Sequence, residues 1–105
     1  MLCAHTVRKL KPGTFEQFKE AFRPPEGTDA PAGWVRFHML RGLRDENEVV
    51  TFGFFNGSLE DLEASQAESD NYQERLDAIA PYVDSVVANG VYDVIVEVTP
   101  ERAAV

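Results

Sequence analysis

The stretch that decides the fold is residues 34–55, WVRFHMLRGLRDENEVVTFGFF. Two runs rich in β-branched and aromatic residues, 34–43 and 49–55, flank the polar segment 44–48. Runs of this composition joined by a short polar turn are typical of a β-hairpin. We therefore predict an antiparallel hairpin here, to which the flanking segments add further elements.

The segment before the hairpin predicts one strand and one helix. Residues 1–11 are rich in β-branched and apolar residues without a helical stripe, and they predict a strand. A helix of about nine residues follows, with Thr14 and Gln17 as its capping box. Its apolar side consists of Phe15, Phe18, Ala21 and Phe22. Residues 24–33 hold three prolines and two glycines, which predict a loop.

The segment after the hairpin predicts a broken helix and a last strand. Ser58 is the expected N-cap, with Asp61 favoured by the helix dipole. The polar residues 69–71 predict a break. Apolar residues then resume at helical spacing: Tyr72, Leu76, Ile79, Val83 and Val86. Residues 91–99 alternate between the two faces of a strand and predict the fourth strand.

This order of elements, strand–helix–strand–strand–helix–strand, restricts the topology. Both crossovers through helices must be right-handed, which leaves few arrangements. The simplest is an α+β, ferredoxin-like βαββαβ fold with a four-stranded antiparallel sheet in the order 4-1-3-2 and both helices on one face. We expect a single domain over residues 1–100 and a loose tail over 101–105.

Both sides of the predicted sheet carry apolar residues. One side is strongly apolar and is expected to meet the helices: Val35, Phe37, Met39, Val50, Phe52, Phe54, Tyr92, Val94, Val96 and Val98. The other side mixes polar residues with six large apolar ones: Trp34, Leu40, Val49, Phe55, Val91 and Ile95. Isolated apolar residues on a surface are ordinary, but a patch of this size is unusual on a monomer. We therefore predict a homodimer in which these sides pack together.

Composition excludes several classes of protein. The chain has 105 residues, of which 44% are hydrophobic, and this is typical of one globular domain. Its net charge of −8 argues against a nucleic-acid partner. No apolar run is long enough for a membrane span or a signal peptide. The single Cys3 cannot form an internal disulfide, so we expect a cytoplasmic protein in which Cys3 packs as a thiol.

The charge is concentrated in one segment. Residues 60–84 hold eight acids and one base, Arg75, and so contribute −7 of the −8. Such a run is typical of a solvated helix face. The alternative is an acidic docking surface for a basic partner.

The chain resembles the antibiotic-biosynthesis monooxygenase family in a pattern that extends over nearly its whole length. The residues that carry the resemblance are Lys11–Phe15 (KPGTF), Gly33–Trp34, Phe54–Leu62 (FFNGSLEDL) and Ser69–Tyr72 (SDNY). The resemblance implies a dimeric α/β barrel in which each subunit has a pocket between sheet and helices. Some members oxidise aromatic polyketides without metal or flavin, whereas others degrade haem, isomerise substrates or bind small signals.

The resemblance also argues against haem degradation. The haem-degrading members use an Asn, a Trp and an iron-ligating His at positions that hold Thr6, Gln66 and Leu76 in this chain. A leucine cannot ligate iron. Many other relatives place a His where Gln66 stands, and an amide does not titrate.

Two candidate catalytic residues lie two positions apart on the second strand. His38 is a candidate acid or base, and Arg36 would favour its neutral form by repulsion. Arg36 is also a candidate for holding a ligand carboxylate, unless Asp93 or Glu97 neutralises it. If the chain has no catalytic role, His38 is a core or interface residue. His38 and His5 do not make a metal site without further ligands.

The candidate ligand-binding residues lie on two predicted strands and two predicted helices, and the family resemblance supports their choice. They are Thr6, Phe18, Phe22, Phe52, Gln66 and Tyr72. Gln66 and Tyr72 would hydrogen-bond a polar group, although Tyr72 is equally typical of a core, and the phenylalanines are more often core residues than pocket residues. Trp34 would either stack on an aromatic ligand or anchor the dimer.

Three functions remain open at this point. The first is a cofactor-independent monooxygenase that acts on a small hydrophobic, aromatic metabolite. The second is a non-catalytic binder of such a molecule, which needs only an apolar cavity with a few polar groups. The third is a structural or regulatory dimer with a filled core. None of the three needs a metal or another cofactor.

Overall fold

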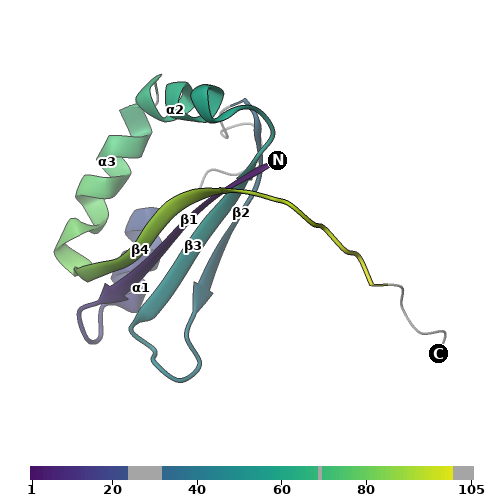
Figure 1. Cartoon of the computed structure of the whole chain (residues 1–105). Coiled ribbons are helices and arrows are strands. Elements are labelled where there is room, and N and C mark those ends of the chain that lie inside the picture. Colours follow the sequence, from purple (N-terminus) through teal and green to yellow (C-terminus); the bar gives the residue numbers. More distant parts are fainter. Residues whose placement is uncertain (24–31, 69, 101–105) are drawn as a thin grey trace.

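The computed structural model describes residues 1–23, 32–68 and 70–100. The elements are, in chain order, β1 (Leu2–Leu10), α1 (Phe15–Phe22), β2 (Trp34–Arg41), β3 (Glu48–Phe55), α2 (Leu59–Glu68), α3 (Asp70–Ile79), the 3-10 turn η2 (Ala80–Tyr82) and β4 (Val83–Asp93). The strands form one antiparallel sheet in the order β2-β3-β1-β4, with the helices over one face (Figure 1). The predicted α+β, ferredoxin-like fold and its strand order are confirmed.

Strand β3 identifies the face of the sheet that the helices cover. Along this strand Val49, Thr51, Gly53 and Phe55 are buried, whereas the residues between them are partly exposed. Val49 and Phe55 have exposed fractions of 0% and 3%, so the prediction that they face a second subunit is wrong. Both sides of β3 are apolar, so hydrophobicity alone could not indicate which side faces the helices. We call the uncovered side the open face.

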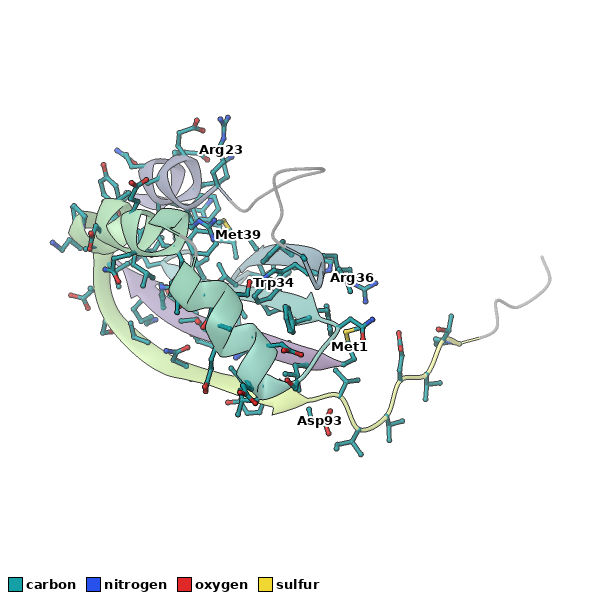
Figure 2. The ribbon with its side chains drawn as sticks, turned by 90° about the horizontal axis from the view of Figure 1, so that it is seen from above. Met1, Arg23, Trp34, Arg36, Met39 and Asp93 are labelled. Atoms are coloured by element: carbon teal, nitrogen blue, oxygen red, sulfur yellow. The ribbon has the colours of Figure 1, made fainter. Side chains whose placement is uncertain are left out.

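The core lies between the sheet and helices α1 and α3. Its buried centre consists of Leu10, Phe18, Val49 and Ile79. Partly buried side chains pack around it: Phe15, Ala21, Phe22, Met39, Leu76, Tyr82 and Val83. The apolar side predicted for α1 is thus confirmed. Figure 2 shows these helices stacked above the sheet.

The two predicted helix caps have different outcomes. The Asp61 amide donates to Ser58 Oγ at 3.1 Å and the Ser58 amide donates to Asp61 Oδ2 at 3.3 Å, as expected of a capped N-terminus. Thr14 precedes α1, but its side chain makes no capping hydrogen bond. Its Oγ1 donates to the Lys11 carbonyl at 2.7 Å instead, so the capping box with Gln17 is wrong.

The fourth strand begins earlier than predicted. The helical stripe ends at Ile79, and η2, which contains Pro81, leads into β4 at Val83. Proline removes a helical hydrogen bond, and the valines that follow favour extended backbone. Gly90 lies inside β4 rather than after a helix, where it pairs with His5.

The segment after β4 has no regular secondary structure, contrary to the strand expected over 91–99. The Val94 amide donates to the Met1 carbonyl at 3.0 Å, and the chain then leaves the sheet (Figure 1). Ile95, Val96 and Val98 are all exposed. The predicted tail 101–105 and most of the predicted loop 24–33 lie outside the described residues. No helix among the described residues is long and apolar enough to span a membrane.

Candidate functional site

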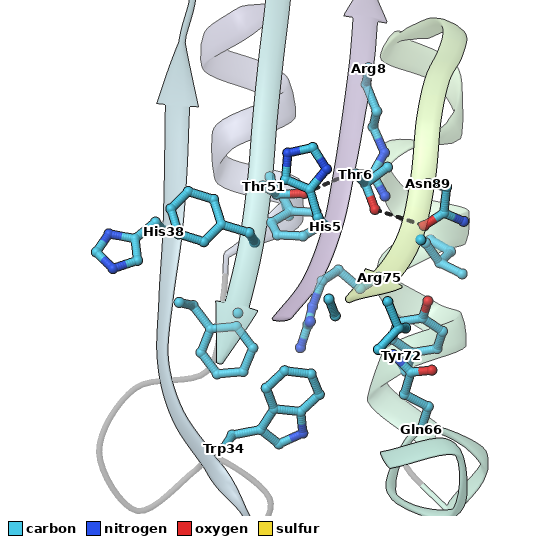
Figure 3. A pocket seen from close by; sticks show the side chains of 18 of the residues that line it. His5, Thr6, Arg8, Trp34, His38, Thr51, Gln66, Tyr72, Arg75 and Asn89 are labelled. Carbon is cyan, nitrogen blue, oxygen red and sulfur yellow. Dashed lines mark hydrogen bonds between the residues drawn. The ribbon is translucent and has the colours of Figure 1, made fainter. Parts of the chain in front are cut away.

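A cavity of about 270 Å³ lies between the covered face of the sheet and the helices. Strands β1, β2, β3 and β4 contribute its floor, and α1, α2 and α3 contribute its cover. Figure 3 shows side chains from both layers around it. The volume is close to the lower end of known small-molecule pockets.

One wall of the cavity is aromatic. The ring of Trp34 stacks on Phe37 with centroids 4.9 Å apart, and it meets Phe55 edge-on at 5.1 Å. Gly53 makes room for this stack, because a Cβ there would lie 2.8 Å from Phe37 Cδ1 and 2.9 Å from Trp34 Cζ3. Gly33, at φ +97°, likewise adopts a conformation that a side chain rarely tolerates. The wall therefore depends on both glycines.

Polar side chains line the opposite part of the cavity. Gln66 and Tyr72 reach it from α2 and α3 (Figure 3). Thr6 Oγ1 donates to Asn89 Oδ1 at 3.1 Å across β1 and β4. Ser65 Oγ is buried and has no hydrogen-bond partner among the described residues. These groups offer donors and acceptors to a ligand that fills the space beside the aromatic wall.

Arg8 brings a buried positive charge into the cavity from β1. Its exposed fraction is 7%, and its Nη1 donates to Thr51 Oγ1 at 2.9 Å. Its Cζ lies 5.4 Å from the centroid of the Phe22 ring. Burial lowers the pKa of Arg8, while the nearby Tyr72 acts in the opposite direction.

Arg75 brings a second positive charge from α3. Its Cζ lies 5.5 Å from the same Phe22 ring centroid, and burial lowers its pKa, again opposed by Tyr72. Among the side chains that the structure describes, which exclude those of residues 68, 70 and 71, no carboxylate forms an ion pair with Arg75 or Arg8. Neither arginine was predicted from the sequence as a site residue. The only signal was that Arg75 is the lone base of an acidic segment.

The open face carries the candidates predicted on the second strand. The His38 ring stacks on Phe52 with centroids 4.8 Å apart, and Arg36 Cζ lies 4.7 Å from the centroid of Phe54. Phe52 follows the helix-facing Thr51, and successive strand residues point to opposite faces. The His38 and Phe52 rings therefore do not join the side chains inside the cavity, although their strands border it.

The predicted interface residues divide between the two faces. Leu40 pairs with Val50 on the open face, and its exposed fraction is 48%. Trp34 lines the cavity, and so does Val91, which pairs with Ala4. The assignment of Trp34 and Val91 to the open face is therefore wrong. Trp34 faces the cavity because of the bulge between Trp34 and Arg36. The bulge adds one residue to β2 and so reverses the alternation of side chains at the start of the strand.

This sequence matches no protein-family model and no curated protein. It does resemble solved structures. A protein of Chloroflexus aurantiacus J-10-fl, provisionally named an antibiotic biosynthesis monooxygenase, is 12% identical with a TM-score of 0.75, covering 93% of this chain and 96% of that chain. A Nitrosomonas europaea protein with the same provisional name is 21% identical with a TM-score of 0.69, covering 91% of this chain and 100% of that chain.

A third solved structure has a described chemistry. SnoaB, a cofactor-independent oxygenase from Streptomyces nogalater, is 15% identical with a TM-score of 0.70, covering 95% of this chain and 97% of that chain. The fold is that of the antibiotic biosynthesis monooxygenases. At these identities the likeness to monooxygenase structures shows the fold alone.

Within this monooxygenase-like fold, most of the predicted ligand-binding residues come together. Thr6, Phe22, Gln66 and Tyr72 all line the cavity. Phe18 does not, because it is fully buried in the core. Phe52 borders the cavity with its strand, while its ring lies on the open face.

The three positions that haem-degrading relatives use also lie at the cavity. Thr6, Gln66 and Leu76 are all among its lining residues. Leu76 carries no donor atom for iron, so the expectation against haem degradation stays as a prediction. Among the described residues, no three His, Cys, Asp or Glu side chains gather into a group suited to a metal ion.

Proposed function

We propose that this protein binds a flat aromatic metabolite in its cavity and oxidises it with molecular oxygen, without metal or flavin. The observation that carries the proposal is the Trp34–Phe37 stack beside polar groups in a space of about 270 Å³. Aromatic walls with a few placed polar groups are typical of sites for aromatic ligands. The same fold in SnoaB, a cofactor-independent oxygenase, supports the chemistry.

The proposed reaction needs little from the protein beyond positioning. In an anthrone-like substrate the two C–H bonds of an activated ring CH₂ break and the carbon becomes C=O; one atom of O₂ becomes the carbonyl oxygen, and the other leaves as water with the two hydrogens. The electrons come from the substrate and oxygen accepts them. Trp34 would hold the ring, and Gln66 and Tyr72 would hydrogen-bond its oxygens.

One observation favours a second candidate, binding without chemistry. No carboxylate is among the described residues that line the cavity, and the His38 ring lies on the open face. Removal of a proton from the substrate requires a base within hydrogen-bond reach. Tyr72 and Ser65 are weak bases, so a non-catalytic binder of the same ligand class is the alternative.

Thermal unfolding and oxygen uptake test the proposal together. Anthrone at 100 times its dissociation constant would stabilise the protein by about 2.7 kcal/mol, and Trp34→Ala is expected to abolish most of this shift. Oxygen uptake faster than with anthrone alone separates the oxygenase from the binder. Stabilisation without uptake supports the binder, and no stabilisation by anthrone contradicts both.

We also propose that two copies pair through the open face. An aromatic group formed by His5, His38, Phe52, Phe54 and Tyr92 lies there. His5 Nδ1 within it is buried without a partner among the described residues. Leu40, also on this face, has an exposed fraction of 48%. A patch of this kind on a monomer favours association.

Light scattering tests the dimer. We expect a mass near twice 11.7 kDa at micromolar concentration. Leu40→Glu should weaken the dimer, because it places a charge in the interface. Leu43→Glu is the matched control, since Leu43 is fully exposed in the turn after β2. A monomeric mass for the unmodified protein contradicts the proposal.

A further inference from the structure

Two guanidinium groups enter the cavity, and neither forms an ion pair with any carboxylate whose side chain the structure describes. Arg8 comes from the sheet and Arg75 from α3 (Figure 3). Both lie over the ring of Phe22, with Cζ to centroid distances of 5.4 and 5.5 Å. The acids of the described ion pairs, Glu16, Glu20, Asp45 and Glu46, pair with other bases. The cavity therefore has a positive end.

An unpaired buried charge costs stability, so its retention calls for an explanation. Removing a cation from water costs several kcal/mol unless hydrogen bonds or an opposite charge compensate it. Arg8 has one hydrogen bond in the structure, from Nη1 to Thr51 Oγ1. A guanidinium carries five N–H donors, so most of its donors are available to a ligand. The same holds for Arg75, for which the structure gives no hydrogen bond to a described residue.

The surrounding charge makes these arginines conspicuous. Residues 60–84 contain eight acids and Arg75 as the only base. Glu74 and Asp77, beside Arg75 on α3, are exposed, while Arg75 lines the cavity. On an α-helix, residues one and two positions apart do not face each other, so Glu74 and Asp77 do not neutralise Arg75. Its position at the cavity instead indicates a role toward what the cavity holds.

We propose that the ligand of this cavity is an aromatic carboxylic acid, with its carboxylate between Arg8 and Arg75 and its ring against Trp34. Guanidinium groups match a carboxylate in shape and form charge-assisted hydrogen bonds with it. Tyr72, which lies close enough to influence the pKa of both arginines, can add its phenol as a donor. This inference rests on the proposed binding of an aromatic ligand, and it specifies in addition that the ligand is negatively charged.

The test compares an anionic probe, 2-naphthoate, with its neutral analogue of nearly the same shape, 2-naphthamide, by calorimetry with the full chain. We expect 2-naphthoate to bind at least tenfold more tightly, which corresponds to about 1.4 kcal/mol. Arg75→Gln should remove this preference and leave the affinity for 2-naphthamide unchanged. Arg44→Gln, in the exposed turn between β2 and β3, is the matched control and should change neither affinity.

A thermal melt of the free Arg75→Gln protein separates lost binding from lost folding. Because the substitution removes an unpaired charge, the melting temperature of the free protein should not fall. Equal affinities for the two probes, or a preference that survives Arg75→Gln, overturn the anion site and leave the aromatic cavity standing. If neither probe binds, the proposed ligand class fails together with this inference.

Discussion

Arg8 on β1 donates a 2.9 Å hydrogen bond from Nη1 to Thr51 Oγ1 on the neighbouring strand β3, and both residues are buried. The bond holds a positive charge at the floor of the cavity. Thr51 pairs with Thr6 across β1 and β3 and with Met39 across β2 and β3, so its hydroxyl stands at the centre of the sheet. The hydroxyl is thus a structural support for the arginine.

Thr51→Val should lower the free energy of unfolding by about 1–3 kcal/mol, because it leaves a donor of a buried cation without its acceptor. Urea unfolding followed by circular dichroism measures the change. Thr6→Val is the control, since the hydrogen bond of Thr6 to Asn89 is exposed and its loss should cost clearly less. Equal effects of the two substitutions would contradict the role of Thr51.

Gly53→Ala should disrupt the aromatic wall. The new methyl would lie 2.8 Å from Phe37 and 2.9 Å from Trp34, and strained packing of this kind costs about 1–3 kcal/mol. Urea unfolding and the fluorescence of Trp34, the only tryptophan, report the change. Gly90→Ala on β4 is the control, because its methyl would meet the exposed Tyr92 ring, closest at the hydroxyl end, at 3.0 Å. A wild-type spectrum for Gly53→Ala would contradict this account of the wall.

Oxygen uptake should distinguish the two faces of the sheet. Tyr72→Phe removes a hydroxyl at the cavity and is expected to reduce uptake with anthrone about tenfold, the order of one lost charge-assisted hydrogen bond in the transition state. His38→Ala on the open face should leave uptake nearly unchanged. The reverse result would support the catalytic role first predicted for His38. If both variants lose oxygen uptake equally, the reaction depends on the proposed pairing of two copies rather than on the cavity alone.

Cys3 should react slowly in the native protein. It lies on the open face, where it pairs with Phe54 and Tyr92, and burial raises the pKa of its thiol. Only the thiolate attacks a disulfide reagent, so a raised pKa leaves less of it at pH 8. Reaction with Ellman's reagent should be slower in buffer than in 6 M urea, and it should accelerate in buffer as the pH rises. Equal rates in buffer and urea would contradict this protection.

The fold was largely predictable because local patterns agree with the topology. The hairpin, the Phe-rich helix and the strand order follow from alternation, spacing and right-handed crossovers. The start of β4 was not predictable in this way, since Val83 and Val86 fit a helical stripe as well as a strand. Contact of β4 with β1, which no local pattern encodes, decides between the two.

The site was predictable only in part. Thr6, Gln66 and Tyr72 were found through the family resemblance, and they do meet at the cavity. Trp34 was assigned to the wrong face, because one bulge shifts its register and a bulge leaves no clear signal in sequence. Arg8 was missed altogether, since an arginine on an apolar strand looks like an edge residue until its neighbours are known.

Arg75 points into the cavity only because of its angular position on α3, and this has a consequence for how the proposed anion site can be lost. An α-helix turns by about 100° per residue, so inserting one residue between Arg75 and Leu76 would rotate the earlier part of α3 by that amount against Ile79. The guanidinium would turn out toward the exposed carboxylates of α3, while the amino-acid composition, the sheet and its open face would stay almost the same. For the ligand proposed above, a single frame-preserving codon insertion in α3, outside the sheet, would therefore be enough to remove the preference for an anion.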